Sequence, residues 1–441
     1  MRDRAIKTIG LLDQMGYGNL GDAAIQDAVI ANIHRRLPNA RLVGFSFIPD
    51  DTLKRHGIPS YPIRWWYPTL QGTENQAVDQ PSLKLKLTST LKKIPFLYGL
   101  AKRLSDLAHE AAFWVKSYWV LRTLDLLIIS GGGQLGELWG GPWGHPYTIF
   151  QFCLLAKLAR KKLYFLNVGA GPLKHPLSRF LVKHALQFAD YRSFRDDDSQ
   201  ELARSLGVKS ETHVYPDPVY ALEVGEYQQH APPPNSAMQI VGLNPLGFCD
   251  PRIWPRKDPA LYHEYLEKLT GFSLWLLDQG YALRVFSTEM SVDRYAIEDL
   301  KARLLSRLAP ELVGQIFPAP SEIVTDLLHQ MSEFDYVVTP KFHGIIFSRM
   351  LRKPVIALSY HRKMDVAMRA GGQEKFCTDI QHFDVPWLVS AFRTLVAEKT
   401  AIQLQSAAAV EAYAARLERQ FDGLFLPETG ASVAIRRPVE S

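Results

Sequence analysis

The feature that most constrains the fold of this chain is a regular alternation between short apolar runs and longer amphipathic segments. Strand-length runs such as Ile6–Leu12 and Asp125–Ser130 are each followed by a segment with helical periodicity. In the segment 22–37, for example, Ile25, Val29 and Ile33 recur every four residues and form one apolar stripe. Alternation of this kind is typical of a parallel sheet covered by helices on both faces, so we expect an α/β fold.

The same pattern predicts two domains, which is also the default for 441 residues. The alternation stops at 226–237, a polar segment with three consecutive prolines, which we interpret as a linker. It restarts at 238 and continues to about 400, and the last segment, 401–425, is helical with no strand after it. We therefore expect two doubly wound Rossmann-like domains, 1–225 and 238–400, with a C-terminal helix, in the two-lobed arrangement of GT-B enzymes.

Residues 65–120 do not fit the alternation, because they are helical in pattern and rich in Lys, Arg, Trp and Tyr. Two interpretations stay open. The insertion is either a basic amphipathic element that lies on a membrane surface, or a pair of helices that packs on the first domain with its lysines in solvent.

Charge and cysteine content exclude several classes of protein. A net charge of +6 suits an anionic substrate or membrane surface, but no basic stripe with interleaved aromatics supports nucleic-acid binding. The three cysteines form no C-x-x-C pair, which argues against a zinc site or a disulfide framework. No leader and no apolar run of membrane-spanning length is recognised. We expect a cytoplasmic protein, with the inner face of the membrane as a further option, and the oligomeric state stays open.

The stretch Gly16–Ile25, GYGNLGDAAI, matches the G-x-G-x-x-G pattern of dinucleotide-binding folds by letter. However, the loop before Gly16 is lengthened, and Asp22 places a carboxylate where the pyrophosphate would bind. We expect Asp22 to cap the following helix and predict no dinucleotide cofactor. The glycines instead favour close approach of another molecule or domain, with Asn19 and Asp22 offering polar groups to a substrate.

A second glycine-rich loop directly follows the apolar run 125–130. Three glycines at the carboxyl end of a strand expose backbone N–H groups at the edge where open α/β sheets bind ligands. A carboxylate and flat aromatic rings, of the kind that stack on sugars, come next; the alternative for the rings is a domain interface. The predicted substrate-binding residues of this loop are Gly131, Gly132, Gly133, Glu137 and Trp139, with Trp143 and Tyr147 offering further rings.

The segment 195–199 contains a formal D-x-D pattern, which some sugar transferases use to bind a metal. Because a helical segment follows, we interpret Asp196–Asp198 as a cap and first-turn charges and predict no essential metal. Arg195 stands at a strand terminus and is suited to bind a carboxylate or phosphate.

The residues that point most strongly to chemistry lie in 335–365. A strand ends at Pro340, and Lys341, His343 and the free N–H groups at Gly344 open a helix, which together predict an anion site. Lys363 follows the next strand and adds a second cation at the same edge of the sheet.

These motifs, in this order, resemble those of the polysaccharide pyruvyl transferase family over about residues 8–390. The matching segments are Gly16–Ala24, Gly131–Gly133, Arg195–Ser199 and Lys341–Lys363. The resemblance implies a GT-B-like fold and transfer of pyruvate from phosphoenolpyruvate to two hydroxyls of a sugar, forming a ketal. Lys341 stands where the family has arginine, which keeps the charge but loses the bidentate geometry, and the insertion 65–120 is longer than expected.

Under this resemblance Arg195, Lys341 and His343 would bind the donor, with His343 as the general acid and Lys363 as a further donor ligand. Asn19, Asp22 and Glu137 would face a saccharide acceptor, whether lipid-linked or free. No cofactor is implied besides phosphoenolpyruvate as donor substrate. Two alternatives remain: a GT-B glycosyltransferase that uses a nucleotide sugar, and a carbohydrate-binding protein without activity.

Overall fold

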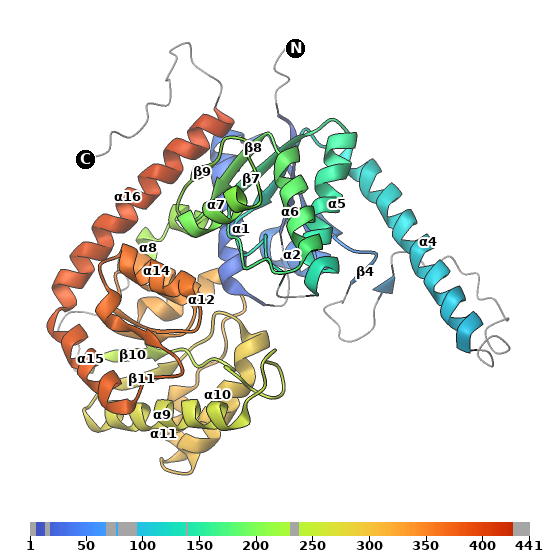
Figure 1. Cartoon of the computed structure of the whole chain (residues 1–441). Coiled ribbons are helices and arrows are strands. Elements are labelled where there is room, and N and C mark those ends of the chain that lie inside the picture. Colours follow the sequence, from blue (N-terminus) through green and yellow to red (C-terminus); the bar gives the residue numbers. More distant parts are fainter. Residues whose placement is uncertain are drawn as a thin grey trace.

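The computed structural model describes residues 6–13, 18–67, 76–77, 95–137, 140–229 and 238–426. It consists of two lobes, each built on a parallel sheet with helices on both faces (Figure 1). Similarly to the prediction, the strands of each sheet alternate with helices along the chain. The expected α/β fold with two Rossmann-like units and a C-terminal helix is confirmed.

The N-terminal sheet has seven parallel strands in the order β3-β2-β1-β6-β7-β8-β9. Its strands are β1 (Thr8–Leu12), β2 (Arg41–Ser46), β3 (Ser60–Pro62), β6 (Leu126–Ser130), β7 (Lys162–Val168), β8 (Tyr191–Phe194) and β9 (His213–Val214). The helical elements are α1 (Leu20–Arg36), α2 (Pro49–His56), η1 (Gly141–Trp143), α5 (His145–Leu158), α6 (Pro176–Phe188), α7 (Asp197–Ser205) and η2 (Pro218–Ala221). Two short strands, β4 (Trp66–Tyr67) and β5 (Gln76–Ala77), pair separately and antiparallel.

The C-terminal sheet has five parallel strands in the order β11-β10-β12-β13-β14. Its strands are β10 (Ile240–Leu243), β11 (Ala282–Val285), β12 (Tyr336–Thr339), β13 (Val355–Ser359) and β14 (Cys377–Asp379). Its helical elements are α8 (Gly225–Gln229), α9 (Pro259–Asp278), α10 (Met290–Leu305), α11 (Pro310–Ile316), α12 (Val324–Ser332), α13 (Phe342–Met350), α14 (Arg362–Ala370), η3 (Glu374–Phe376) and α15 (Val385–Ala397).

The central strands are buried on both faces, as expected for a parallel sheet with two helical layers. Every residue of β6, β12 and β13 is buried, and these strands consist mostly of Val, Ile and Leu. One continuous apolar core extends from Ile9 and Leu20 of the first lobe through the second sheet to Phe425. The two lobes are therefore held together by apolar packing as well as by the chain.

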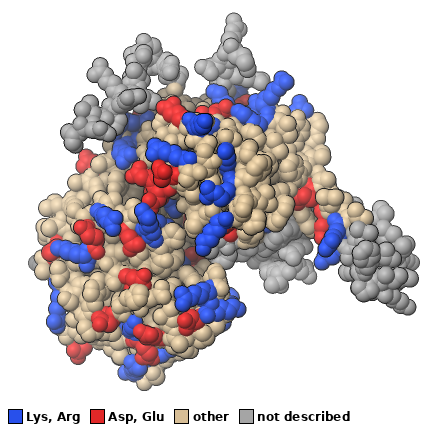
Figure 2. All heavy atoms as spheres, viewed as in Figure 1, with Lys and Arg blue, Asp and Glu red and all other residues tan. Residues whose placement is uncertain are grey.

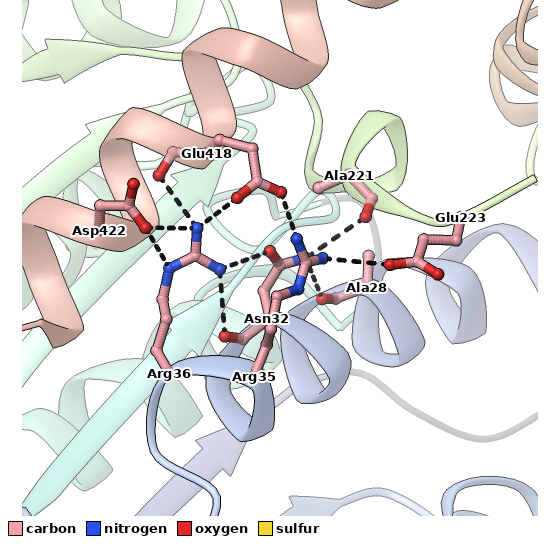
Figure 3. Close-up of polar contacts among 8 residues, drawn as sticks. All are labelled: Ala28, Asn32, Arg35, Arg36, Ala221, Glu223, Glu418 and Asp422. Atoms are coloured by element: carbon pink, nitrogen blue, oxygen red, sulfur yellow. Dashed lines mark hydrogen bonds and ion pairs between the residues drawn. The ribbon is translucent and has the colours of Figure 1, made fainter.

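The last helix, α16 (Lys399–Phe425), runs from the second lobe back to the first (Figure 1). Near its start Lys399 pairs with Asp335 at 2.7 Å, just before β12. Near its end Glu418 and Asp422 both bind Arg36 of α1, whose side chain is only 4% exposed (Figure 3). The Arg36 Nε donates to Asp422 at 2.8 Å, and its Nη1 donates to Asn32 at 2.9 Å. The helix thus fastens the second lobe to the first.

Besides β4 and β5, the described part of the insertion is one long helix, α4 (Pro95–Leu121), which extends away from the first lobe (Figure 1). Its C-terminal half packs on α5: the Tyr147 hydroxyl donates to Glu110 at 2.7 Å, and Trp114 Nε1 donates to that hydroxyl at 3.1 Å. Residues 68–75 and 78–94 of the insertion lie outside the described residues. Within the part of the chain that the structure describes, no helix has the length and hydrophobicity needed to cross a membrane.

Candidate active site

The start of α13 brings the predicted histidine toward the first lobe. β12 ends at Thr339, and Lys341 is the N-cap residue of α13, so His343 lies in the first helical turn. Its ring lies against Gly21 of α1, because a Cβ added at Gly21 would overlap the His343 imidazole. The glycine of the N-terminal motif therefore allows a residue of the other lobe to approach, as the sequence suggested.

Backbone contacts hold α1 against the second lobe at this point. The Leu20 N–H donates to the Thr288 carbonyl at 2.8 Å, and Asn19 forms an isolated antiparallel bridge with Glu289. The Asn19 side chain caps α1 by accepting from the N–H groups of Gly21 and Asp22 at 3.0 and 3.2 Å. The expectation that Asp22 caps this helix is wrong: the side chain one turn earlier has the cap position, and Asp22 lies in the first turn.

Two predicted cations lie on the same phenylalanine ring next to His343. The Arg195 Cζ is 4.9 Å and the Lys363 Nζ is 5.5 Å from the centroid of the Phe342 ring. The buried Asp217 lies between the arginine and the histidine, with its Oδ2 3.6 Å from Arg195 Nη1 and 3.9 Å from His343 Nε2. Arg195, His343 and Lys363 are thus brought together by residues from both lobes.

The electrostatics of this cluster favour a negatively charged ligand. Burial, and then the charges of Arg195, Lys363 and Lys341, hold the pKa of His343 well below its usual range, so the ring is neutral. Burial and the neighbouring Arg195 lower the pKa of Lys363 to about 8. Burial is the larger cause of both shifts, and the neighbouring cations add to it; the negative charge of a bound anion would act against the cationic contribution.

The pKa of Asp22 is shifted in the opposite direction to the pKa values of His343 and Lys363. Burial and the carboxylate of Glu289 raise its pKa to about 6, although Lys363 and Arg195 act against that shift. Its carboxylate oxygen also lies near the second glycine-rich loop, 3.5 Å from where a Cβ would sit on Gly132. Asp22 therefore belongs to the cluster, and at neutral pH it is mostly ionised.

Lys341, which we expect from the sequence to bind the donor, forms ion pairs within the protein. Its Nζ pairs with Glu289 at 2.9 Å and with the fully buried Asp293 at 3.1 Å. Burial opposes the lysine charge, but Asp293 and Glu289 outweigh it and raise the pKa of Lys341 above its ordinary value. Its charge is therefore compensated within the protein, and it secures α10 to the start of α13.

The other predicted substrate residues are divided between the cluster and more distant positions. Gly131 and Gly132 both have positive φ, and Gly131 packs against Ile25 of α1. Gly133 is exposed, with no atom within 4 Å of an added Cβ. The Glu137 carboxylate accepts from the Lys174 and His175 N–H groups at 2.6 and 3.2 Å, which ties this loop to the start of α6. Trp139 lies outside the described residues.

The acidic run after Arg195 is a helix start, as predicted. Asp196 caps α7 by accepting from the Ser199 N–H at 2.7 Å, and Asp197 and Asp198 lie in the first turn. Asp198 also pairs with Arg362 of the second lobe at 2.9 Å. Among the described residues, no group of three His, Cys, Asp or Glu side chains is arranged to hold a metal ion.

Three residues of this cluster were not found by sequence reasoning: Asp217, Glu289 and Phe342. Asp217 stands between two prolines in the sequence, three residues after the end of β9. An acidic residue in this position, close to the carboxyl end of a strand, could have been predicted as a site residue. Glu289 carries no comparable signal, because its position follows only from the contact between the lobes.

Comparison with known proteins identifies the family of this chain. The model of the family described as polysaccharide pyruvyl transferase matches residues 19–362, which include Asn19, Arg195, Asp217 and His343. The chain belongs to this family. Among curated proteins, no sequence matches it significantly.

Solved structures that share the fold of this chain include UDP-N-acetylglucosamine 2-epimerases. A putative UDP-N-acetylglucosamine 2-epimerase from Listeria monocytogenes is similar with a TM-score of 0.55 and 11% identity, covering 95% of this chain and 98% of that one. The S. aureus MnaA–UDP structure gives 0.54 and 11%, over 97% and 99%. UDP-GlcNAc 2-epimerase from Neisseria meningitidis, bound to UDP-GlcNAc, gives 0.51 and 12%, over 94% and 100%. At such low identity the likeness concerns the GT-B-like fold alone.

Proposed function

We propose that this protein transfers pyruvate from phosphoenolpyruvate to two hydroxyls of one sugar residue of a polysaccharide or its precursor. The observation that supports the proposal is that Arg195 and Lys363 both lie against the Phe342 ring, next to a buried neutral histidine. Phosphoenolpyruvate carries a phosphate and a carboxylate, and it needs fixed positive charges of this kind. An arginine fork suits either group, and a lysine supplies a mobile point charge.

The reaction needs a proton at the C3 methylene of the donor, and His343 is the group we assign to deliver it. The ring is neutral without a ligand, but the negative charges of the donor would raise its pKa, and Asp217 stands 3.9 Å from Nε2 to stabilise the imidazolium. Protonation turns C3 into a methyl group and leaves C2 electron-poor. The first sugar hydroxyl then bonds to C2 and loses its proton.

The second half of the reaction closes the ketal. The C2–O bond to phosphate breaks, inorganic phosphate leaves with the bonding electrons, and the second hydroxyl bonds to C2 and loses its proton. Of the two hydroxyl protons, one balances the proton added at C3 and the other leaves with phosphate. Asp22, with a pKa of about 6 and in the same cluster, is the carboxylate we assign to accept a hydroxyl proton.

Binding and turnover of phosphoenolpyruvate test this proposal. We expect calorimetry to detect phosphoenolpyruvate binding, and we expect phosphate release that depends on an acceptor from a panel of p-nitrophenyl hexosides and N-acetylhexosaminides. The alternative is a glycosyltransferase that uses a nucleotide sugar, consistent with the fold of the similar structures. Tight binding of UDP with no binding of phosphoenolpyruvate would favour that alternative.

The His343→Gln variant tests the assigned acid. It should still bind phosphoenolpyruvate, since the cations remain, but it should lose roughly 100-fold or more in kcat. A matched control is His184→Gln on α6, where the ring nitrogen contacts the Phe180 carbonyl and near-normal activity is expected. Full activity of the His343 variant would remove the histidine from the mechanism.

A further inference from the structure

The outward face of α4 is apolar along four turns, which is the reverse of an ordinary surface helix. Four large apolar side chains on this face are 57–66% exposed, and they recur at helical spacing. The alanines between them are exposed as well. The members of this apolar stripe are Leu104, Leu107, Ala108, Ala111, Ala112, Val115 and Trp119.

The orientation of the helix is fixed by its opposite face. Phe113, Ser117 and Leu121 are buried against the first lobe. Glu110 is held by the Tyr147 hydroxyl, and Trp114 lies between Glu110 and the same tyrosine. The helix therefore has a packed side without the stripe, and the residues of the stripe are on the exposed side.

Basic residues accompany the stripe. Lys102, Arg103, Lys116 and Arg122 are exposed, and the Arg122 guanidinium lies 4.9 Å from the centroid of the Trp119 ring. In the sequence, residues 80–105 contain six Lys or Arg and no Asp or Glu. On the face shown in Figure 2, basic and acidic side chains are interspersed, and acidic side chains are also seen on the projecting helix. The segment 102–122 has four basic residues against Asp106 and Glu110, the second of which is held by Tyr147, so this part of the chain combines exposed apolar surface with net positive charge.

We propose that α4 docks this protein on an anionic lipid surface. The helix would lie in the membrane plane, with Leu107, Val115 and Trp119 among the acyl chains and the lysines and arginines at the headgroups. Trp119 with its neighbouring Arg122 suits the boundary between the two regions. This proposal does not depend on the proposed activity.

The charge distinguishes this partner from a second copy of the chain. A two-fold interface through the stripe would place the same patch on both subunits, so the net positive charge of the segment 102–122 on one copy would meet the same charge on the other. Like charges at close range oppose such an interface, whereas acidic headgroups would neutralise them.

Vesicle co-sedimentation of the full-length protein tests the proposal. Vesicles of equal parts phosphatidylglycerol and phosphatidylcholine should bind the wild type, and phosphatidylcholine alone should bind it at least tenfold more weakly. The double variant Leu107→Asp/Val115→Asp should lose at least tenfold in affinity for the anionic vesicles, because two inserting side chains are replaced by charges that headgroups repel. Raising the salt concentration should weaken wild-type binding.

A matched control is Leu404→Asp on α16, an equally exposed leucine at 69%, which should bind vesicles like the wild type. Three results would overturn the proposal. They are no binding of the wild type to anionic vesicles, unchanged binding of the double variant, and a wild-type dimer in sedimentation that the double variant abolishes.

Discussion

Replacement of Gly21 by alanine tests whether the approach of the two lobes at His343 matters for activity. The backbone at Gly21 is helical and accepts alanine, and alanine is favoured over glycine in helices by up to about 1 kcal/mol. The new Cβ, however, would lie 2.7 Å from the Cβ of His343 and closer still to its ring. Since carbon atoms in contact are separated by roughly 3.5 Å or more, the histidine must move by about 1 Å.

The two effects have different consequences for stability and for activity. Steric strain of this kind costs about 1–3 kcal/mol, so the helix gain leaves a net destabilisation of at most about 2 kcal/mol, and the protein should fold. A displacement of about 1 Å at a reacting group costs on the order of 100-fold in rate, and we expect that loss in kcat/KM for phosphoenolpyruvate. Phosphate-release assays and urea denaturation measure the two quantities on the same sample.

Gly314→Ala is the matched control, because Gly314 also lies in a helix, α11, and an added Cβ there would meet no atom within 4 Å. It should stabilise the protein by up to about 1 kcal/mol and leave activity unchanged. Activity of the Gly21 variant within threefold of wild type would refute the reasoning, since the histidine would then not need its place against α1.

Three further predictions concern the charges of the cluster. Lys363 has a pKa of about 8 without ligand, and a bound anion raises that pKa. The affinity for phosphoenolpyruvate should therefore fall above pH 8 by up to tenfold per pH unit, and binding should take up a proton there, which calorimetry in buffers of different ionisation enthalpy measures. An affinity that stays constant up to about pH 9.5 would exclude Lys363 as a donor ligand. Asp217→Asn should lower kcat about 10–100-fold without raising KM for phosphoenolpyruvate. The alkaline limb of the kcat pH profile should move to lower pH, because the pKa of His343 falls when its counter-charge is removed. A raised KM with unchanged kcat would contradict this role of Asp217. Lys341→Met should destabilise the protein by about 3–5 kcal/mol in urea denaturation, because it leaves Asp293 buried without its cation. The stability of Lys341→Arg should stay near that of the wild type. Normal stability of the Met variant, together with a selective loss of phosphoenolpyruvate binding, would show instead that Lys341 binds the donor.

The periodicity of the chain was sufficient to predict the fold. Strands buried on both faces, such as β6 and β13, are continuous apolar runs, and they alternate with amphipathic helices that begin close to the expected residues. The first helix, expected over 22–37, spans Leu20–Arg36. Helix starts were harder to assign, because Asn19 and Asp22 are both good capping residues three positions apart, and only the geometry of the turn selects Asn19.

Members of the cluster were predicted where a cation follows a strand, and were missed where their position depends on the other lobe. Arg195, His343 and Lys363 all lie just after strands, so that topology alone brings them to the edges of the two sheets. Lys341 obeys the same rule, yet its partners Glu289 and Asp293 come from α10 and its preceding loop, and no local pattern shows that they reach it. Whether a charge is available to a ligand therefore depends on contacts that periodicity does not contain.

Because α16 begins on the second lobe and ends on the first, neither half of the chain contains all the contacts that its own fold makes. The first lobe ends its strands at Val214, but Gln420 of α16 donates to Asn167, Tyr191 and Ser193 inside it. A fragment that stops after Gln229 would lack these partners and those of Arg36, and the remaining fragment would carry a helix end with no surface to bind. Cleavage of the backbone between Gln229 and Met238 should consequently yield two pieces that stay associated, with the final helix of one completing the fold of the other.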